Sequence, residues 1–250
     1  MRLGALLSIH DGARPGSLPE RARLLEAEGY SSIWAAQAIG RGFMLTDPFI
    51  ALAAVAAATE NVEIGTAIMQ LPLYNPADIA LKSWSLQQIS GGRLSLGLGV
   101  GSTRTDYAAH DLTFDQRFEA FETKLGQLRQ IYETGVANEQ DLTPWPDVNG
   151  APSLLFGTWG KNVARAANEF DGWIASGMHR GPEECAQALI EYRAAGGRRA
   201  IVSTIHVRAG SDTGELRDRL LAYEAAGFDD AVVMFLPGAP GLDKVRALIP

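Results

Sequence analysis

Short apolar runs alternate with longer amphipathic stretches along the whole chain. The short runs predict strands, whereas the longer stretches predict helices. We predict eight strands, over residues 3–9, 31–36, 62–69, 94–100, 153–157, 171–175, 200–207 and 230–236. Strands that alternate regularly with helices indicate a parallel sheet with helical crossovers.

Capping residues mark where several of the intervening helices begin. Residues 17–20 are SLPE, which predicts a capping box, while Asp47-Pro48 and Asn75-Pro76 each place a cap before a first-turn proline. Eight strand–helix units in 250 residues predict an α/β protein, a single (β/α)8 TIM barrel over residues 1–250. A doubly wound open sheet is the alternative fold.

Two connecting segments are longer than the others. Residues 37–46 follow a predicted strand, which places them at the carboxyl end of the barrel, where the active sites of this fold lie. Residues 136–152 follow a predicted helix and therefore start from the opposite end. We expect the second segment to be an insertion or an interface loop.

The charge balance narrows the range of partners. A net charge of −7 and an isoelectric point near 5.2 argue against binding to nucleic acid or to an anionic membrane, because both need clustered positive charge. The single cysteine, Cys185, excludes an internal disulfide, and the N-terminus has no cleavage site typical of a signal peptide. We expect a soluble, cytoplasmic protein.

Residues 91–103, GGRLSLGLGVGST, contain glycines spaced G-x-G-x-G inside a predicted strand. A dinucleotide-binding loop instead needs G-x-G-x-x-G between a strand and a helix, so this alternative is weakly supported. Glycine inside a strand is typical of a crowded place. In a barrel, we expect Gly97 and Gly99 to keep one side of the lumen open, so that a flat group can lie over the strand ends.

The predicted strand ends carry few groups able to do chemistry alone. Asp11 has no second carboxylate to form a glycosidase pair, the four histidines are scattered, and no G-x-S-x-G nucleophile motif is present. No metal site is predicted. The small polar residues that remain suit an organic cofactor, which brings its own reactivity.

Residues 65–102, GTAIMQLPLYNPADIALKSWSLQQISGGRLSLGLGVGS, closely resemble the central stretch of the bacterial luciferase-like superfamily of flavin- and F420-dependent oxidoreductases. The matching features are the strand G-T-A-x-x-x-L-P, a proline opening the next helix, and S-G-G-R before L-x-L-G. Residues 29–36, 111–123 and 153–177 follow in the family's order, so the resemblance covers nearly the whole chain.

The resemblance implies where a cofactor would be held. In this family a non-proline cis peptide bond in the third strand supports the isoalloxazine ring, and the matching bond joins Ala67 and Ile68. Two loops match the cofactor-phosphate region, and Ser8 is a further candidate contact; the loop residues are Gly101, Ser102, Thr103, Arg104, Gly157, Thr158, Trp159 and Gly160. Both loops would offer backbone N–H groups at a helix N-terminus, which favours an anion.

One departure from the family concerns proton transfer. Many members have an acidic residue followed by histidine after the second strand, whereas this chain has Gln37-Ala38. Glutamine can orient a ligand but cannot carry a proton near neutral pH. His10 is therefore the remaining candidate general acid, and His179 and Arg180 are candidates for binding an anionic substrate or cofactor tail. We expect His206 to be packed inside the barrel.

These features favour an oxidoreductase that moves a hydride between F420 and a small organic substrate. One alternative is a monooxygenase that uses reduced FMN from a separate flavin reductase. A second alternative is a non-catalytic flavin-binding protein, which the replacement at Gln37-Ala38 motivates. The small residues of the helix after Pro48 lead us to expect a homodimer.

Overall fold

A computed structural model describes residues 1–7, 17–39 and 45–250 of the chain. Its main sheet contains parallel strands only, and every strand predicted from the sequence is present. They are β1 (Arg2–Leu6), β2 (Ser32–Ala35), β3 (Glu63–Thr66), β4 (Met69–Gln70), β5 (Leu94–Gly99), β8 (Ser153–Gly157), β9 (Gly172–Ser176), β10 (Ala200–Val207) and β11 (Asp230–Phe235). The predicted third strand is divided into β3 and β4.

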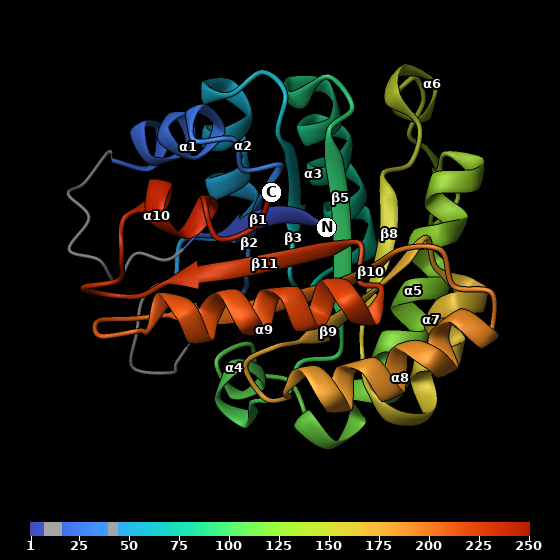
Figure 1. Cartoon of the computed structure of the whole chain (residues 1–250). Coiled ribbons are helices and arrows are strands. Elements are labelled where there is room, and N and C mark those ends of the chain that lie inside the picture. The colour runs from blue at the N-terminus through green and yellow to red at the C-terminus, as the bar shows by residue number, and fades with distance from the viewer. Residues whose placement is uncertain (8–16, 40–44) are drawn as a thin grey trace.

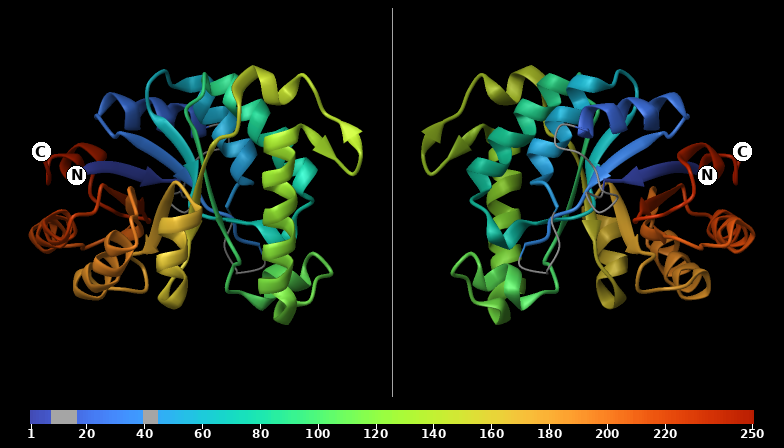
Figure 2. Two further views of the ribbon diagram at one scale, coloured as in Figure 1. Left: turned by 90° about the vertical axis from the view of Figure 1, so that its right-hand side faces the viewer. Right: turned by 90° about the vertical axis from the view of Figure 1, so that its left-hand side faces the viewer.

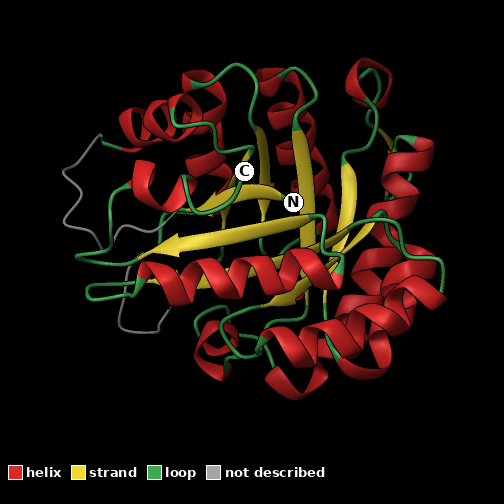
Figure 3. Ribbon diagram, in the orientation of Figure 1, coloured by secondary structure: helices red, strands yellow, loops and turns green. Residues whose placement is uncertain are grey.

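The sheet closes on itself. Its strand order is β3-β2-β1-β11-β10-β9-β8-β5-β4, and an additional pairing between β3 and β5 completes the ring. In register, Leu6 lies beside Trp34 on one side and Met234 on the other. Figure 3 shows the helices as an outer layer around the strands. The predicted (β/α)8 barrel is confirmed, and the open doubly wound sheet is excluded.

The helices fill the connections between strands (Figure 1). They are α1 (Leu18–Ala27), α2 (Pro48–Ala58), α3 (Pro76–Ser90), α4 (Arg104–Ala108), α5 (Arg117–Thr134), α6 (Trp145–Asn149), α7 (Val163–Glu169), α8 (Pro182–Ala194), α9 (Thr213–Ala226) and α10 (Leu242–Arg246), with 3-10 turns at Leu71–Leu73, Phe114–Gln116 and Gly160–Asn162.

Two of the three predicted helix caps are confirmed. The Asp47 carboxylate accepts from the backbone N–H groups of Phe49 and Ile50, and the Asn75 side chain accepts from that of Ala77. The capping box at Ser17 is wrong: the helix does begin at Leu18, but Ser17 has a helical backbone and its side chain makes no capping bond. The feature of SLPE that does mark the start of this helix is the proline in its first turn.

Side chains fill the barrel lumen. The inner core contains Leu6, Trp34, Ala67, Leu155, Ile174, Ile201, Val232 and Met234. A Cβ atom at Gly97 would lie 2.0 Å from the Thr66 carbonyl oxygen and 2.6 Å from Cδ1 of Ile174. The expectation that these glycines keep the lumen open is therefore wrong, because they make room for side chains from neighbouring strands.

Charged residues close the amino end of the barrel. Arg199 donates to both carboxylate oxygens of Glu63, at 2.8 and 2.9 Å, and to Asp230 at 2.9 Å. Arg2 pairs with the same two carboxylates, and Ser95 donates to Glu63 at 2.6 Å. The four charged groups balance one another, which is what allows carboxylates to be buried here.

The segment over residues 136–152 is partly structured. It forms a small hairpin of β6 (Val136–Ala137) and β7 (Gln140–Asp141), with Asn138 and Glu139 both at positive φ in the turn, and then α6. Figure 2 shows this hairpin projecting from the barrel at the end opposite to α4. The segment therefore lies away from the carboxyl ends of the strands, as predicted.

Candidate active site

The carboxyl ends of the barrel strands bring most of the predicted site residues to one end of the molecule. Gln37 follows β2, Gly101 follows β5, and Gly157–Gly160 follow β8. His179 and Arg180 follow β9. Two predicted candidates, Ser8 and His10, lie outside the described residues together with Asp11.

Ile68 forms an apolar ledge at this end of the barrel. The Ala67–Ile68 peptide bond is cis, as the resemblance implies, and it lies between β3 and β4. A Cβ atom at Gly157 would lie 2.3 Å from Cγ2 of Ile68, and one at Gly99 would lie 2.9 Å from its Cδ1. The glycines on β5 and β8 thus give Ile68 the space to extend across both strands.

Gln37 is held by three hydrogen bonds. Its backbone N–H donates to the Ile68 carbonyl at 3.2 Å, its Oε1 accepts from the backbone N–H of Gln70 at 2.9 Å, and its Nε2 donates to the Tyr74 hydroxyl at 2.7 Å. Gln37 is therefore fixed against the segment that follows the cis bond. Its catalytic role stays a prediction.

A buried carboxylate stands behind this segment. Asp106 is fully buried, and it accepts from Nε2 of Gln70 at 2.7 Å and from the backbone N–H of Ile39 at 3.2 Å. This carboxylate was not predicted from the sequence. Asp106 lies in the first turn of α4, seven residues after the end of β5, and only its hydrogen-bond partners show that it belongs to the site.

The loop from Gly101 to Arg104 turns away from β5 into α4. Gly101 has φ +73°, and a Cβ atom there would lie 1.8 Å from Oε1 of Gln70. Ser102 is exposed and Thr103 is half-buried. Arg104 is exposed on the surface, where it pairs with Asp115 at 2.9 Å. The five-residue α4 is too short for the strong helix dipole that the sequence suggested.

The loop after β8 is packed against the loop after β9. The Arg180 guanidinium lies 4.1 Å from the ring centre of Trp159, and Trp159 lies against the buried Trp173. The Thr158 carbonyl accepts from the Trp173 indole at 3.0 Å. Gly160, at φ +63°, has no neighbouring atom within 4 Å of a Cβ position. The structure thus brings Trp159 and Arg180 into contact, which was not predicted from the sequence.

Cationic residues surround the ends of β9 and β10. The strand β10 is irregular at Thr204, which has φ +62°. Beyond this point, the side chains of Ile205 and Val207 belong to the core between the sheet and the helices. Strand alternation therefore turns His206 to the inner side. Burial, followed by the charges of nearby cations, lowers the pKa of His206. We call Arg180 and Arg208, which follow the ends of β9 and β10, the cationic rim. His206 is half-buried there, rather than packed as predicted.

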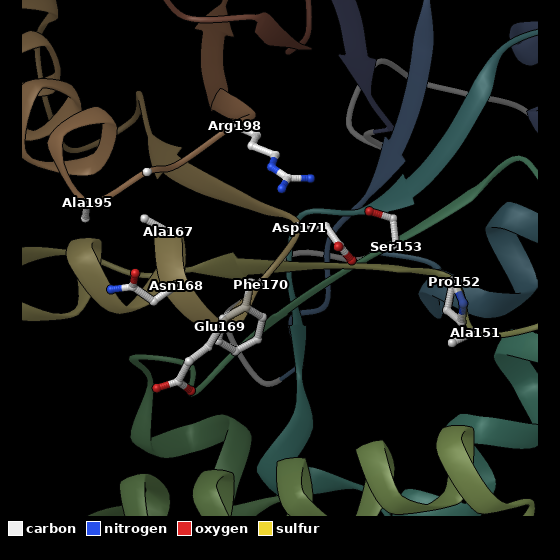
Figure 4. Close-up of a pocket in the computed structure, with 11 residues that line it drawn as sticks. Ala151, Pro152, Ser153, Ala167, Asn168, Glu169, Phe170, Asp171, Ala195 and Arg198 are labelled. Carbon is white, nitrogen blue, oxygen red and sulfur yellow. The ribbon is translucent and has the colours of Figure 1, made fainter.

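A pocket at the opposite end of the barrel does not belong to this site. Figure 4 shows it between the segments that precede β8, β9 and β10, with Ser153, Phe170, Asp171 and Arg198 in its lining. Its lining comes from the amino ends of strands, whereas TIM-barrel chemistry is carried at the carboxyl ends.

Among the described helices, none is long and apolar enough to cross a membrane.

A closed barrel with an apolar ledge, fixed amides and cations at one end defines a TIM-barrel protein suited to an organic, anionic cofactor. The family model of the luciferase-like monooxygenases matches residues 1–239. The chain therefore belongs to the luciferase-like monooxygenase family, and membership supports an oxidoreductase.

Individual relatives are more distant. A putative coenzyme F420-dependent oxidoreductase from Mycobacterium tuberculosis is 25% identical over 195 residues, which is 70% of this chain and 55% of that protein. The chain spans about half the length of the curated relatives that it matches, 56% and 55% for two of them.

Solved structures show the same fold with two different cofactors. An F420-dependent secondary alcohol dehydrogenase, in complex with an F420-acetone adduct, has a TM-score of 0.83 at 15% identity and covers 100% of this chain and 98% of that chain. The oxygenating constituent of 3,6-diketocamphane monooxygenase from Pseudomonas putida, in complex with FMN, has a TM-score of 0.67 at 17% identity, covering 100% and 84%. At this identity the likeness shows the fold.

Proposed function

We propose that this protein is an F420-dependent oxidoreductase that transfers a hydride to or from a small organic substrate. The observation that carries the proposal is the Ile68 ledge, which lies beside the loops of the cationic rim at one end of the barrel. The dehydrogenase and the mycobacterial oxidoreductase named above support F420 as the cofactor.

The residues present fit such a cofactor. Ile68 offers an apolar surface for one face of a flat ring, and glycine at positions 99 and 157 gives the Ile68 side chain its space. The cationic rim would hold the anionic tail, since Arg forms strong bonds to phosphate and carboxylate oxygens. Bound F420 supplies a carrier of two electrons and a proton, and the surrounding protein orients the substrate and excludes water.

The FMN-containing neighbour structure favours a second candidate function, a monooxygenase that receives reduced FMN from a separate reductase. The same ledge and rim suit FMN, which is also flat and anionic. The two candidates differ in which cofactor binds and in whether oxygen is consumed.

Fluorescence titration with F420, and separately with oxidised and reduced FMN, tests the proposal. We expect micromolar or tighter binding of F420, and about tenfold weaker binding by Arg180→Gln, from the loss of one charge-assisted contact. Arg23→Gln, an exposed change on α1, is the control. Preference for reduced FMN would favour the monooxygenase, and binding without turnover of any electron acceptor would favour a non-catalytic protein.

We also propose that the chain forms a homodimer through α2 and its neighbours. Exposed apolar side chains gather on three adjacent helices: Leu24 on α1, Ile50 on α2, and Leu81 and Ile89 on α3. Exposed apolar side chains on neighbouring helices favour a protein interface there.

A further inference from the structure

Tyr74 keeps a hydroxyl proton that its hydrogen bond to Gln37 does not use. A backbone N–H can only donate, so the Gln37 atom that faces the N–H of Gln70, at 2.9 Å, must be the oxygen. The other end of the amide is therefore the NH₂ group, and it donates to the Tyr74 hydroxyl at 2.7 Å. Tyr74 is thus the acceptor in this bond, and its own proton points elsewhere.

The amide that binds this hydroxyl is itself held by further hydrogen bonds. The Gln37 backbone N–H donates a hydrogen bond to the Ile68 carbonyl, and its Oε1 accepts one from the backbone N–H of Gln70. The Gln70 side chain is held in turn by the buried Asp106, at 2.7 Å. The Tyr74 hydroxyl is therefore held beside the segment that forms the Ile68 ledge.

Tyr74 is protonated at neutral pH. Burial, together with the charge of Asp47, raises the pKa of Tyr74 to about 12. Within the described parts of the chain, no residue accepts a hydrogen bond from this hydroxyl. The side chain is half-buried, so a ligand at the carboxyl end of the barrel has access to part of it.

His110 lies next to Tyr74 and is partly exposed to solvent. The two ring centres are 6.3 Å apart. Nδ1 of His110 faces the backbone carbonyl of Asp106 at 2.8 Å, and because a carbonyl only accepts, Nδ1 carries the proton. In this tautomer Nε2 carries no hydrogen.

We propose that Tyr74 is the proton-donating catalytic residue of this site and that Gln37 is its positioning residue. This inference rests on the proposed function. Reduction of a carbonyl needs a hydride at carbon, which a reduced deazaflavin supplies, and a proton at oxygen. As the C=O π bond breaks, the oxygen takes the proton of the Tyr74 O–H bond, and the tyrosinate regains a proton from solvent through His110. In the direction of oxidation the steps reverse: the Tyr74 hydroxyl first gives its proton to solvent through His110, and the tyrosinate oxygen then accepts the alcohol proton as the hydride leaves the carbon.

The test uses the F420-loaded protein and isobutyramide, a carbonyl compound that a hydride does not reduce. Binding of isobutyramide is followed by the cofactor's fluorescence, in wild type, Tyr74→Phe and the control Tyr30→Phe. Tyr30 precedes β2, and its hydroxyl donates to the Leu242 carbonyl at 2.9 Å. We expect Tyr74→Phe to weaken isobutyramide binding about tenfold, as expected for one lost hydrogen bond, with the F420 affinity unchanged, and Tyr30→Phe to change neither.

A second measurement follows reduction of acetone by reduced F420. We expect Tyr74→Phe to lower kcat about 100-fold or more. Gln37→Leu should lower kcat with little change in F420 affinity, and this variant also serves if Tyr74→Phe does not fold. Equal isobutyramide affinity in wild type and Tyr74→Phe overturns the inference, as does undetectable isobutyramide binding by the F420-loaded wild type. Failure of the wild type to bind F420 overturns the proposed function itself, and the inference with it.

Discussion

Gly101 is the point where the loop after β5 touches the buried amides of the site. Its φ of +73° suits glycine, and a Cβ atom would lie 1.8 Å from Oε1 and 2.6 Å from Cδ of Gln70. We predict that Gly101→Ala destabilises the protein by two effects. A left-handed backbone costs a non-glycine residue about 1–2 kcal/mol, and displacement of the Gln70 amide adds about 1–3 kcal/mol.

A matched variant separates the two effects. Gly210 has φ +72° and no atom within 4 Å of its Cβ position. Gly210→Ala should therefore show only the backbone cost. Urea unfolding of both variants measures the difference in the free energy of unfolding, and equal losses would contradict the contact with Gln70.

Single residues of the candidate site could be predicted from the sequence, but the hydrogen bonds between them could not. Gln37 was identified as a candidate from its place after the second strand. Its partners are distant along the chain: the bonds from Gln37 to Tyr74 and from Gln70 to Asp106 join residues 37 and 36 positions apart. No local pattern signals such a pairing, since it arises only when β2, β4 and α4 meet around the barrel.

The ends of two helices are joined by one side chain, Arg93. Its Nε donates to the Ser90 carbonyl at the end of α3, at 2.7 Å. Its Nη2 donates to the carbonyls of Ala56 and Thr59 at the end of α2, and its Nη1 donates to Thr59 Oγ1 and to the Val62 carbonyl. The S-G-G-R motif therefore terminates a helix and satisfies carbonyl groups that helix ends leave unpaired.

We predict that Arg93→Lys lowers the free energy of unfolding by about 2–4 kcal/mol, because an ammonium group cannot reach all these acceptors in the fork geometry of a guanidinium. Chemical denaturation measures this loss. The control is Arg23→Lys, on the exposed face of α1. A loss no larger than that of the control would show that the contacts of Arg93 do not stabilise the helix ends.

Elements with strong periodicity were predictable, and short ones were not. All eight strand regions were found because buried parallel strands are continuous apolar runs. The division between β3 and β4 was not, since no turn residue such as proline or asparagine interrupts residues 62–69, VEIGTAIM. The two-residue strands β6 and β7 were also missed, because pairs of residues carry no periodic signal.

The whole barrel is closed at its amino end by the cluster of Arg2, Glu63, Arg199 and Asp230. Burial acts to raise the pKa of Glu63, but the hydrogen bonds and charge of Arg199, with Ser95 and Arg2, hold that pKa below its ordinary value of 4.5. Between the lowered folded-state pKa and 4.5, the unfolded chain binds more protons. The stabilisation is therefore complete above the unfolded-state pKa and is lost as the pH falls through the folded one.

We predict that Glu63→Gln costs about 3 kcal/mol at pH 7, because it breaks a buried ion pair. It should also flatten the pH dependence of the free energy of unfolding below pH 4.5. Urea unfolding at several pH values measures both effects, with Glu191→Gln on the exposed side of α8 as the control. An acid slope identical to that of the wild type would contradict the role of Glu63.

The proposed dimer would form through exposed apolar side chains at the molecular surface. Ile50 on α2 is 68% exposed, and Ile190 on α8 is 63% exposed. Only Ile50 has exposed apolar neighbours on adjacent helices, so we predict that Ile50→Glu dissociates the dimer and Ile190→Glu does not. A two-fold interface buries the residue twice, and at about 1.5 kcal/mol or more per copy the dissociation constant should rise at least about a hundredfold. Sedimentation velocity at micromolar concentration measures this change. A wild-type monomer would contradict the dimer, whereas equal effects of both variants would place its interface elsewhere.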